Sequence, residues 1–445
     1  MLRFGTDGVR GRAYENLFPD DCIRLAQAFT RALTPSSPII IGRDTRDSSP
    51  DFAHALCAGF NAMGIHTIDL GVAPTPAVAW VAATQAAPGV VVSASHNPWH
   101  DNGLKLFSPK GLKLDNEIQA TLESILSDPD WQPIPTLGTP NRTSDGTGLL
   151  QQYQQALTAS VNFDANGLKV VVDAANGAAT AVLAQPLQAH NLIVTVINAN
   201  PDGRNINRQC GSTYPDTVAE AVVRHNADLG LTFDGDADRV LAVDHTGAVL
   251  DGDQIIAICA TDRKQRNKLA GNTVVVTVMT NLGFHRAMAK QQINVVTTPV
   301  GDRNVWTALE EGQWALGGEQ SGHVIFPELT TTGDGMVTAL QLLEVVVRRS
   351  VPLKDLAAEA MTKMPQVLHN VKMGPASLDE QHLNSAVAAA EKTLQGNGRL
   401  LIRPSGTEPV IRIMVEAETS QLAQSVAADL ASAYTAAEQE NAKWQ

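Results

Sequence analysis

A serine that follows a predicted strand is the first residue in this chain that could do covalent chemistry. Ser95 lies in the segment Ala94–Pro98, directly after the apolar run Val90–Val92. Ligands of α/β sheets bind at the carboxyl ends of strands, and the Asn-Pro pair after the serine favours a turn that exposes its hydroxyl. An inconsequential polar loop could have the same composition. The weight of this prediction therefore depends on motifs elsewhere in the chain.

Three alternating aspartates offer a second kind of chemistry. Asp234, Asp236 and Asp238 lie between two apolar runs, Leu229–Phe233 and Val240–Val243. Carboxylates with this spacing can converge on one hard cation, and Mg2+ is the best candidate. An EF-hand is excluded, because the positions that would require glycine and glutamate hold arginine and histidine. A solvated acidic turn is the other alternative, but it would rarely lie between two buried strands.

Other polar side chains suit a sugar phosphate. Arg239 could anchor a phosphate beside the aspartates, and Glu319 and Ser321, on a glycine-rich loop, suit hydrogen bonds to sugar hydroxyls. The turn Arg403–Pro409 combines a guanidinium, hydroxyls and backbone amides, which is typical of a phosphate nest or of a simple hairpin. We expect Arg43 to brace loops. The remaining candidates are His96, Lys105, His323 and Arg10 near the reacting groups, and Arg403, Ser405, Gly406 and Thr407 in the phosphate nest.

The elements that must position these residues form a repeat. Three stretches show the order strand, helix, strand, helix, third strand, and the third strands are Val90–Val92, Leu229–Phe233 and Trp314–Leu316. A loop rich in functional residues follows each third strand. Strands that alternate with helices predict largely parallel sheets. The segment from residue 365 onward has a different pattern, which predicts a smaller α+β domain.

The length of 445 residues exceeds what one hydrophobic core serves, so several domains are expected. The fold class is predicted as α/β, with three similar α/β domains of mainly parallel mixed sheets and a smaller C-terminal α+β domain around a central cleft. The expected domains are 1–147 with the serine turn, 148–251 with the metal-binding loop, 252–364 with the sugar-binding loop, and 365–445 with the phosphate-binding loop.

Composition restricts the class of protein. A formal charge of -13 argues against nucleic acid as a partner, and no apolar run approaches the roughly 18 residues of a membrane span. The amino-terminal residues have no apolar core like that of a signal peptide, so a cytoplasmic location is expected. The four cysteines are scattered and are predicted to be reduced and structural. If the chain is a cytoplasmic enzyme, a homodimer is a reasonable expectation.

Five motifs in this order resemble those of the α-D-phosphohexomutases over nearly the whole chain: Phe4–Gly11, Ala94–Pro98, Asp234–Arg239, Gly318–His323 and Arg403–Pro409. Within that family, the opening segment, Asp101-Asn102-Gly103 and Gln320 are similar to members that act on glucosamine phosphates. Members that act on mannose or glucose phosphates usually have methionine in place of Gln320. Two departures from the family pattern are Ser49, commonly glycine, and the Trp99-His100 pair, usually Phe-Tyr.

The resemblance implies a phosphoserine at Ser95 and Mg2+ bound by its phosphate with the three aspartates. It also implies proton transfer by Lys105 or His323, sugar contacts from the glycine-rich loop, and a nest that binds the phosphate not being transferred. The implied reaction interconverts glucosamine 6-phosphate and glucosamine 1-phosphate through a 1,6-bisphosphate. Its product leads to UDP-N-acetylglucosamine and the bacterial cell wall.

Three alternatives remain open from the residues. The first is the same reaction on mannose or glucose phosphates. The second is a magnesium-dependent phosphatase with Asp234 as nucleophile, which would stay active without Ser95. The third is a non-catalytic sugar-phosphate sensor, which would bind without turnover.

Overall fold

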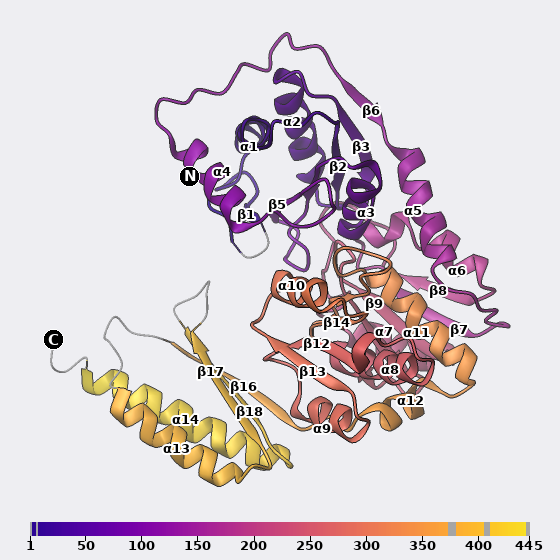
Figure 1. Ribbon diagram of the computed structural model, residues 1–445, viewed down its shortest axis with the longest axis vertical. Helices are drawn as coiled ribbons and strands as arrows, with labels where there is room; N and C mark the ends of the chain where they lie inside the picture. Colours follow the sequence, from indigo (N-terminus) through magenta and orange to yellow (C-terminus); the bar gives the residue numbers. More distant parts are fainter. Residues whose placement is uncertain (1, 6–7, 373–379, 405–409, 442–445) are drawn as a thin grey trace. The chain divides into compact units, whose positions relative to one another are not determined.

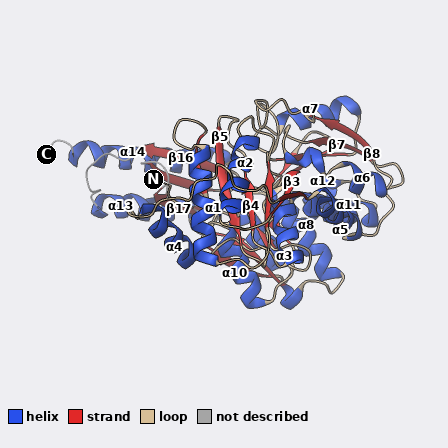
Figure 2. Cartoon of the chain, turned by 90° about the horizontal axis from the view of Figure 1, so that it is seen from above, coloured by secondary structure: helices blue, strands red, loops and turns tan. Residues whose placement is uncertain are grey.

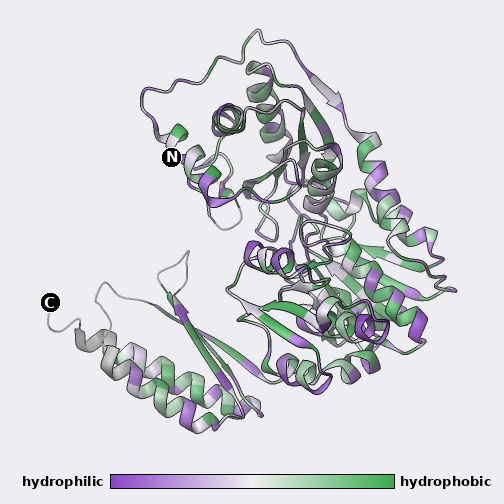
Figure 3. Ribbon diagram, in the orientation of Figure 1, coloured by the Kyte–Doolittle hydropathy of each residue, from purple (hydrophilic) through white to green (hydrophobic). Residues whose placement is uncertain are grey.

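The computed structural model describes residues 2–5, 8–372, 380–404 and 410–441. The chain divides into two compact units (Figure 1). The first comprises Met1–Met279 with Gln292–Ala360, and the second comprises Thr280–Gln291 with Met361–Gln445. Within the first unit, the described strands form three separate mixed sheets. Hydrophobic residues follow these strands (Figure 3), as expected for sheets covered by helices.

The first sheet has the strand order β1-β5-β4-β2-β3-β6. Its strands are β1 (Val9–Arg12), β2 (Ile39–Arg43), β3 (Thr67–Val72), β4 (Gly89–Val92), β5 (Asp101–Phe107) and β6 (Thr143–Asp145). Its helices are α1 (Pro19–Leu33), α2 (Ser49–Ala62), α3 (Thr75–Gln85) and α4 (Asn116–Ser127). Alternation along β2 directs Ile39 and Ile41 to the core shared with α1 and α2. Gly42 instead faces Val78 of α3, so helices cover both faces (Figure 2).

The second sheet has the order β11-β10-β9-β7-β8. Helix α5 (Thr147–Ala159) precedes it in the chain. Its strands are β7 (Lys169–Asp173), β8 (Ile193–Ile197), β9 (Leu229–Phe233), β10 (Val240–Asp244) and β11 (Val249–Leu250), and its helices are η1 (Ala178–Ala181), α6 (Ala184–Ala189) and α7 (Asp216–His225). Apolar side chains of β7, β10 and α7 form one core, which anchors β10, the strand that follows the aspartates.

The third sheet has the order β13-β12-β14-β15. Its strands are β12 (Thr273–Thr277), β13 (Asn294–Thr298), β14 (Gly317–Gly318) and β15 (Val324–Ile325). The helices of this part are α8 (Gly252–Gln265), η2 (Ala270–Asn272), α10 (Asp302–Gly312), α11 (Gly335–Arg349) and α12 (Leu353–Ala360). Val305 and Leu309 of α10 pack on Val275 and Ile325 of the sheet.

The directions of three strands determine where the functional loops lie. The strands β4, β9 and β14 each run parallel to the first strand of their repeat and antiparallel to the strand that follows them. The intervening loops therefore leave the carboxyl ends of these strands, where α/β sheets place their ligands. The predicted repeat and the α/β class are confirmed.

The third strand of the last repeat was predicted at the wrong residues. The sequence favoured Trp314–Leu316, but the strand is β14, Gly317–Gly318. The backbone N–H of Trp314 donates instead to the Leu309 carbonyl, which continues the turn at the end of α10. A strand of two glycines carries no side-chain pattern by which the sequence could reveal it.

The second unit contains the antiparallel sheet β16-β18-β17. Its elements are β16 (Gln366–Lys372), β17 (Arg399–Pro404), β18 (Val410–Glu416), α9 (Leu282–Lys290), α13 (Glu380–Leu394) and α14 (Ser420–Asn441). Ile413 and Val415 of β18 belong to one core with Val426 and Leu430 of α14. The predicted α+β character of this segment is confirmed.

The described residues also include all four cysteines and the helices relevant to a membrane span. All four cysteines are buried and unpaired in disulfides, as predicted. None of the described helices has the length and apolar character that crossing a membrane requires.

Helix α11 begins at a buried aspartate whose charge is costly. Asp334 accepts hydrogen bonds from the backbone N–H groups of Met336 and Val337, at 2.9 and 3.0 Å, and from the hydroxyl of Tyr153 in α5, at 2.7 Å. Burial nevertheless dominates and raises the pKa of Asp334 from 3.8 to about 6. These contacts tie α11 to α5 at the core of the first unit.

We expect this aspartate to make the first unit less stable as pH rises. In the unfolded chain Asp334 loses its proton near its usual pKa, whereas in the folded chain it holds the proton to about pH 6. Ionisation therefore costs the fold about 3 kcal/mol above pH 6 and nothing well below pH 4. Asp334→Asn keeps a capping oxygen but cannot ionise. Urea unfolding at pH 4 and pH 7.5 should show the wild type losing stability relative to Asp334→Asn as pH rises, and an unchanged difference would contradict this account.

Candidate active site

Ser95 lies on a strained turn directly after β4. Its backbone is in the left-handed region, with φ 53°, and its side chain is buried. A non-glycine residue adopts this conformation only when its surroundings hold it there. The backbone N–H of Ser95 donates to Ser93 Oγ at 2.9 Å, and Ser95 Oγ donates to Asp234 Oδ2 at 2.7 Å. The turn thus directs the serine hydroxyl at Asp234, the first of the three alternating aspartates.

A fully buried arginine holds the segment that we name the Ser95 turn, residues 95–97. Arg46 donates to the carbonyl oxygens of Ser95, Asn97 and Asp101 at 2.8, 3.0 and 2.9 Å, and also contacts that of Pro98. Its Nε lies 2.7 Å from Asp44 Oδ2. A guanidinium has five donors in a fixed geometry, so one side chain can satisfy several carbonyls.

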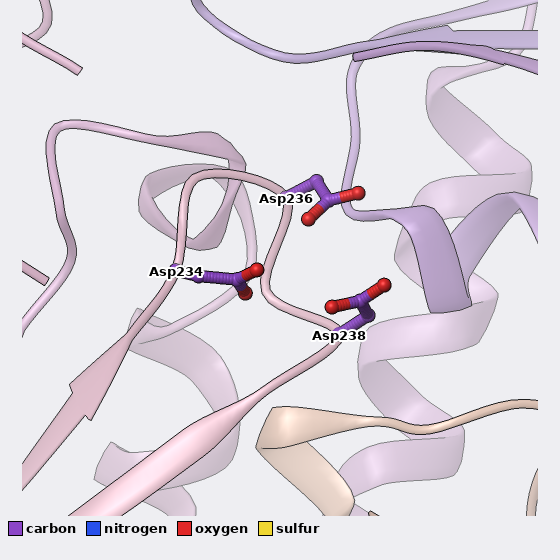
Figure 4. Close-up of side chains that lie close together, drawn as sticks. All are labelled: Asp234, Asp236 and Asp238. Atoms are coloured by element: carbon purple, nitrogen blue, oxygen red, sulfur yellow. The ribbon is translucent and has the colours of Figure 1, made fainter. Parts of the chain in front are cut away.

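The three aspartates converge as the sequence predicted. All lie on the aspartate loop, residues 234–239, between β9 and β10, and all are buried. One carboxylate oxygen from each lies within 4.8 Å of the others. Figure 4 shows the three carboxylates gathered at this loop. Ala237 within the loop has a left-handed φ of 56°, which turns the chain tightly enough for alternate residues to meet.

The donor set of this aspartate triad fits a hard cation. The Oδ1 atoms of Asp236 and Asp238 are buried and accept no hydrogen bond from the described part of the chain. Buried carboxylate oxygens without a partner are costly, and a divalent cation that prefers oxygen ligands would satisfy them. Ser95 Oγ adjoins the same group through Asp234. A phosphate on that oxygen would extend the set of oxygen ligands.

Lys105 provides positive charge to the triad. Its side chain projects from β5 and is buried, with Nζ 2.7 Å from Asp236 Oδ2 and 3.2 Å from Asp238 Oδ2. Thr75 at the start of α3 also donates to Asp236 Oδ2, at 2.5 Å. The first domain therefore supplies both a charge and a hydroxyl to carboxylates of the second.

Asp234 and Asp238 have different affinities for protons. Burial raises the pKa of Asp234 well above its usual value, and the negative charges of Asp238 and Asp236 raise it further. Burial also opposes ionisation of Asp238, but the charge of Lys105 and the nearby His323 outweigh it, so the pKa of Asp238 falls well below its usual value.

Three of the predicted candidates lie close to Ser95: His96, Arg239 and Arg10. His96 Nδ1 lies 3.4 Å from Ser95 Oγ and 3.4 Å from an Arg239 guanidinium nitrogen. Burial lowers the pKa of His96 to about 4, and the charges of Arg239 and Arg10 contribute. His96 is thus neutral near pH 7. Arg10 in β1 reaches Asn97 Oδ1 at 3.4 Å, which places two guanidinium groups around the serine.

The glycine loop, residues 317–323, brings His323 to the triad. His323 Nε2 accepts a hydrogen bond from the backbone N–H of Gly333 at 3.0 Å, so its ring proton lies on Nδ1, 3.8 Å from Asp238 Oδ1. Glu319 and Ser321 lie on the same loop. Glu319 accepts from the Gly301 N–H at 3.1 Å, whereas Ser321 Oγ is buried and without a hydrogen-bond partner among the described residues.

The predicted phosphate nest lies in the second unit. Arg403 is in β17 and pairs in register with Arg412 of β18. Partial burial lowers the pKa of Arg403, and the charge of Arg412 lowers it further. Two adjacent guanidinium groups suit a phosphate dianion. The other predicted members of the nest, Ser405, Gly406 and Thr407, lie outside the described residues.

Sequence reasoning missed several residues that shape this site. The bracing role expected of Arg43 belongs to Arg46, from the same Gly-Arg-Asp-Thr-Arg turn. Nothing in the sequence indicates that Thr75 reaches Asp236. Of the two departures from the family pattern, Ser49 donates to Asp44 at 2.7 Å, and the Trp99 ring lies 5.1 Å from the Arg204 guanidinium. Ser49 thereby contacts the carboxylate that pairs with Arg46.

The arrangement is suited to phosphoryl transfer. A serine hydroxyl adjoins an oxygen-rich cation site, with guanidinium and ammonium groups around it, on side chains held by buried contacts. Phosphoryl transfer depends mainly on such positioning and on stabilisation of negative charge.

Comparison with family models places the whole architecture in one family. Models of the phosphoglucomutase/phosphomannomutase family match in chain order: α/β/α domain I at residues 1–132, α/β/α domain II at 151–247, α/β/α domain III at 251–364, and the C-terminal domain at 350–433.

Comparison with individual proteins identifies the family of this chain more specifically. The phosphoglucosamine mutase of Frankia alni is 48% identical over 448 residues, which cover 98% of each chain. A phosphoglucomutase/phosphomannomutase family protein of Burkholderia thailandensis has the same fold, with a TM-score of 0.81 at 22% identity over 97% of each chain. The N-acetylphosphoglucosamine mutase of Aspergillus fumigatus, solved with GlcNAc-6P and magnesium, gives a TM-score of 0.69 at 18% identity, over 98% of this chain and 96% of its own. The chain belongs to the phosphoglucosamine mutase family of phosphohexomutases.

Proposed function

We propose that this chain interconverts glucosamine 6-phosphate and glucosamine 1-phosphate through a phosphoserine at Ser95. The observation that carries the proposal is the 2.7 Å hydrogen bond from Ser95 Oγ to Asp234, which places the hydroxyl at the edge of the aspartate triad. Membership of the phosphoglucosamine mutase family supports the choice of substrate. The strained turn and its buried braces support the role of Ser95 as the group that carries phosphate.

The reaction balances as two transfers in opposite directions. In the first, the bond from phosphorus to Ser95 Oγ breaks and a bond forms to the free hydroxyl oxygen of the bound monophosphate, which gives glucosamine 1,6-bisphosphate. The sugar hydroxyl loses a proton, and Ser95 Oγ gains one. After the bisphosphate reverses its orientation, Ser95 takes the other phosphoryl group and the product leaves. Lys105 and His323, which both contact the triad, are our candidates for moving these protons.

We propose Mg2+ as the cofactor, held by Asp234, Asp236 and Asp238 with the phosphate of Ser95. The unpartnered carboxylate oxygens support this assignment. The magnesium in the Aspergillus fumigatus enzyme agrees with it. A divalent cation there would offset negative charge on the transferring phosphoryl group.

The remaining candidates are assigned to the sugar and its second phosphate. Glu319 and Ser321 would bind sugar hydroxyls, for which the unpartnered Ser321 Oγ offers a free hydrogen-bonding group. His96 and Arg239 would contact the substrate beside Ser95, with Arg10. Arg403, together with Ser405, Gly406 and Thr407, would bind the phosphate that is not transferred. We accordingly assign phosphoserine, metal, sugar and phosphate roles to residues 1–147, 148–251, 252–364 and 365–445.

Substitution of Ser95 is the decisive test. Ser95→Ala removes the oxygen that forms the phosphoryl bond, so turnover of glucosamine 6-phosphate with Mg2+ and a trace of bisphosphate should fall at least about 10³-fold. The measurement is a coupled assay for glucosamine 1-phosphate. Ser108→Ala is the matched control, because Ser108 lies after β5 and contacts the backbone of Lys110 rather than the triad.

Other outcomes identify other functions. Release of inorganic phosphate that persists in Ser95→Ala would indicate a phosphatase with Asp234 as nucleophile. Faster turnover of mannose or glucose phosphates by the wild type would transfer the proposal to those sugars. Binding without turnover of any of the three would indicate a sensor.

Removal of one triad carboxylate should weaken Mg2+ binding. Asp236→Asn deletes a charge while it keeps the shape, so the dissociation constant for Mg2+ should rise about 10- to 100-fold and turnover at fixed Mg2+ should fall correspondingly. Isothermal titration of the metal-stripped protein with MgCl2 measures the binding directly. Asp244→Asn is the matched control, because Asp244 is equally buried at the end of β10 but holds a turn through Thr246. Equal Mg2+ affinity in both variants would show that the triad does not bind the metal.

A further inference from the structure

A second side chain donates to the same carbonyls of the Ser95 turn as Arg46 does. Asn207 Nδ2 lies 2.8 Å from the Ser95 carbonyl oxygen and 3.1 Å from that of Asn97. Both partners are acceptors, so the amide nitrogen must face the turn. Arg46 donates to the same two oxygens from within the first domain. The two donors therefore hold the turn from opposite domains.

Asn207 is itself held rigidly in the second domain. It is buried, its φ is 55°, and its backbone N–H donates to the Ala175 carbonyl at 3.0 Å, just beyond β7. The loop that follows is fixed at Gly211, whose N–H donates to Asp173 at 2.9 Å, and at Ser212, which donates to the Phe233 carbonyl at 2.8 Å. Asn207 is thus anchored to the ends of β7 and β9, and β9 leads directly into the aspartate loop.

The aspartate loop is shaped to admit this contact. A Cβ added at Gly235 would lie 2.6 Å from the Ser95 carbonyl oxygen and 2.8 Å from Asn207 Nδ2. Such distances are too short for any side chain. The close approach of the aspartate loop, the Ser95 turn and Asn207 therefore requires glycine at position 235.

We propose that Asn207 is a positioning residue for phosphoryl transfer. It fixes the position of the Ser95 turn relative to the domain that carries Asp234, Asp236 and Asp238. Arg46 holds the turn against its own domain, but only Asn207 ties the carbonyls of Ser95 and Asn97 to the second domain by side-chain donors among the described residues. Its Oδ1 is buried and accepts no hydrogen bond within that part of the chain, so the contacts of the amide are those made to the turn.

The consequence for catalysis lies in the transfer step. The proposal rests on the mutase function proposed above, in which the phosphoryl group must lie in line between Ser95 Oγ and the sugar hydroxyl. Displacement of a reacting atom by about 1 Å can cost on the order of 10²-fold in rate. Asn207 contacts the backbone of the nucleophile, so its loss should lower kcat and leave KM nearly unchanged.

The experiment compares two asparagines that share burial and backbone geometry. Asn207→Gly removes the amide, and glycine accommodates the left-handed φ without strain. Asn176→Gly is the matched control: Asn176 is buried with φ 48°, but its side chain contacts Asn200, Asn205 and Cys210 rather than the turn. Asn207→Asp keeps the shape and replaces the two donors with a charged acceptor. Each variant is measured for kcat, KM, Tm and backbone hydrogen exchange over residues 93–101.

We expect Asn207→Gly to lower kcat about 10- to 100-fold with KM changed less than about threefold, and Asn207→Asp to lower it at least as much. Exchange over residues 93–101 should become at least about tenfold faster in Asn207→Gly but not in Asn176→Gly, with similar Tm values. Equal exchange and equal kcat in the two glycine variants would overturn the positioning role. Exchange needs no turnover, so an inactive wild type with faster exchange in Asn207→Gly would refute the mutase proposal while the contact itself stands.

Discussion

Three carboxylates buried within 4.8 Å of one another are the constraint on which this site depends. Like charges at that separation in a buried setting repel strongly, so the fold must bring compensating groups to them. The first domain supplies Lys105 and Thr75, and the third supplies His323. Groups from the first and third domains therefore contact the negative charge that the second domain presents.

The Ser95 turn lies beside these carboxylates and is held in place by side chains of two domains. The left-handed backbone conformation of Ser95 is unfavourable by itself. It is stabilised because the backbone carbonyls of the turn accept hydrogen bonds from Arg46 on one side and Asn207 on the other. These hydrogen bonds involve only the backbone carbonyl groups of the turn. The hydroxyl remains directed at Asp234 and is available for chemistry.

The sequence was sufficient to predict the repeat, the convergence of the three aspartates and the position of Ser95 directly after a strand. Each depends on a local pattern: alternating strands and helices, alternate aspartates, or a serine after an apolar run. It could not predict Arg46, Thr75 or Asn207 as parts of the site. Their contacts join residues that are 49, 161 and 112 positions from their partners, and no local pattern encodes such a meeting. The two-glycine strand β14 was misplaced for a related reason, since its pairing is carried wholly by the backbone.

The separation of 131 residues between Lys105 and Asp236 also bears on how the protein is made. Contacts between distant residues form late, because the entropy of closing a long loop must be overcome before they contribute. An aspartate loop that forms before the two domains join lacks the lysine that the first domain supplies. A cation that binds at this stage would stand in for that lysine, so the ion concentration during synthesis could influence how readily the domains join.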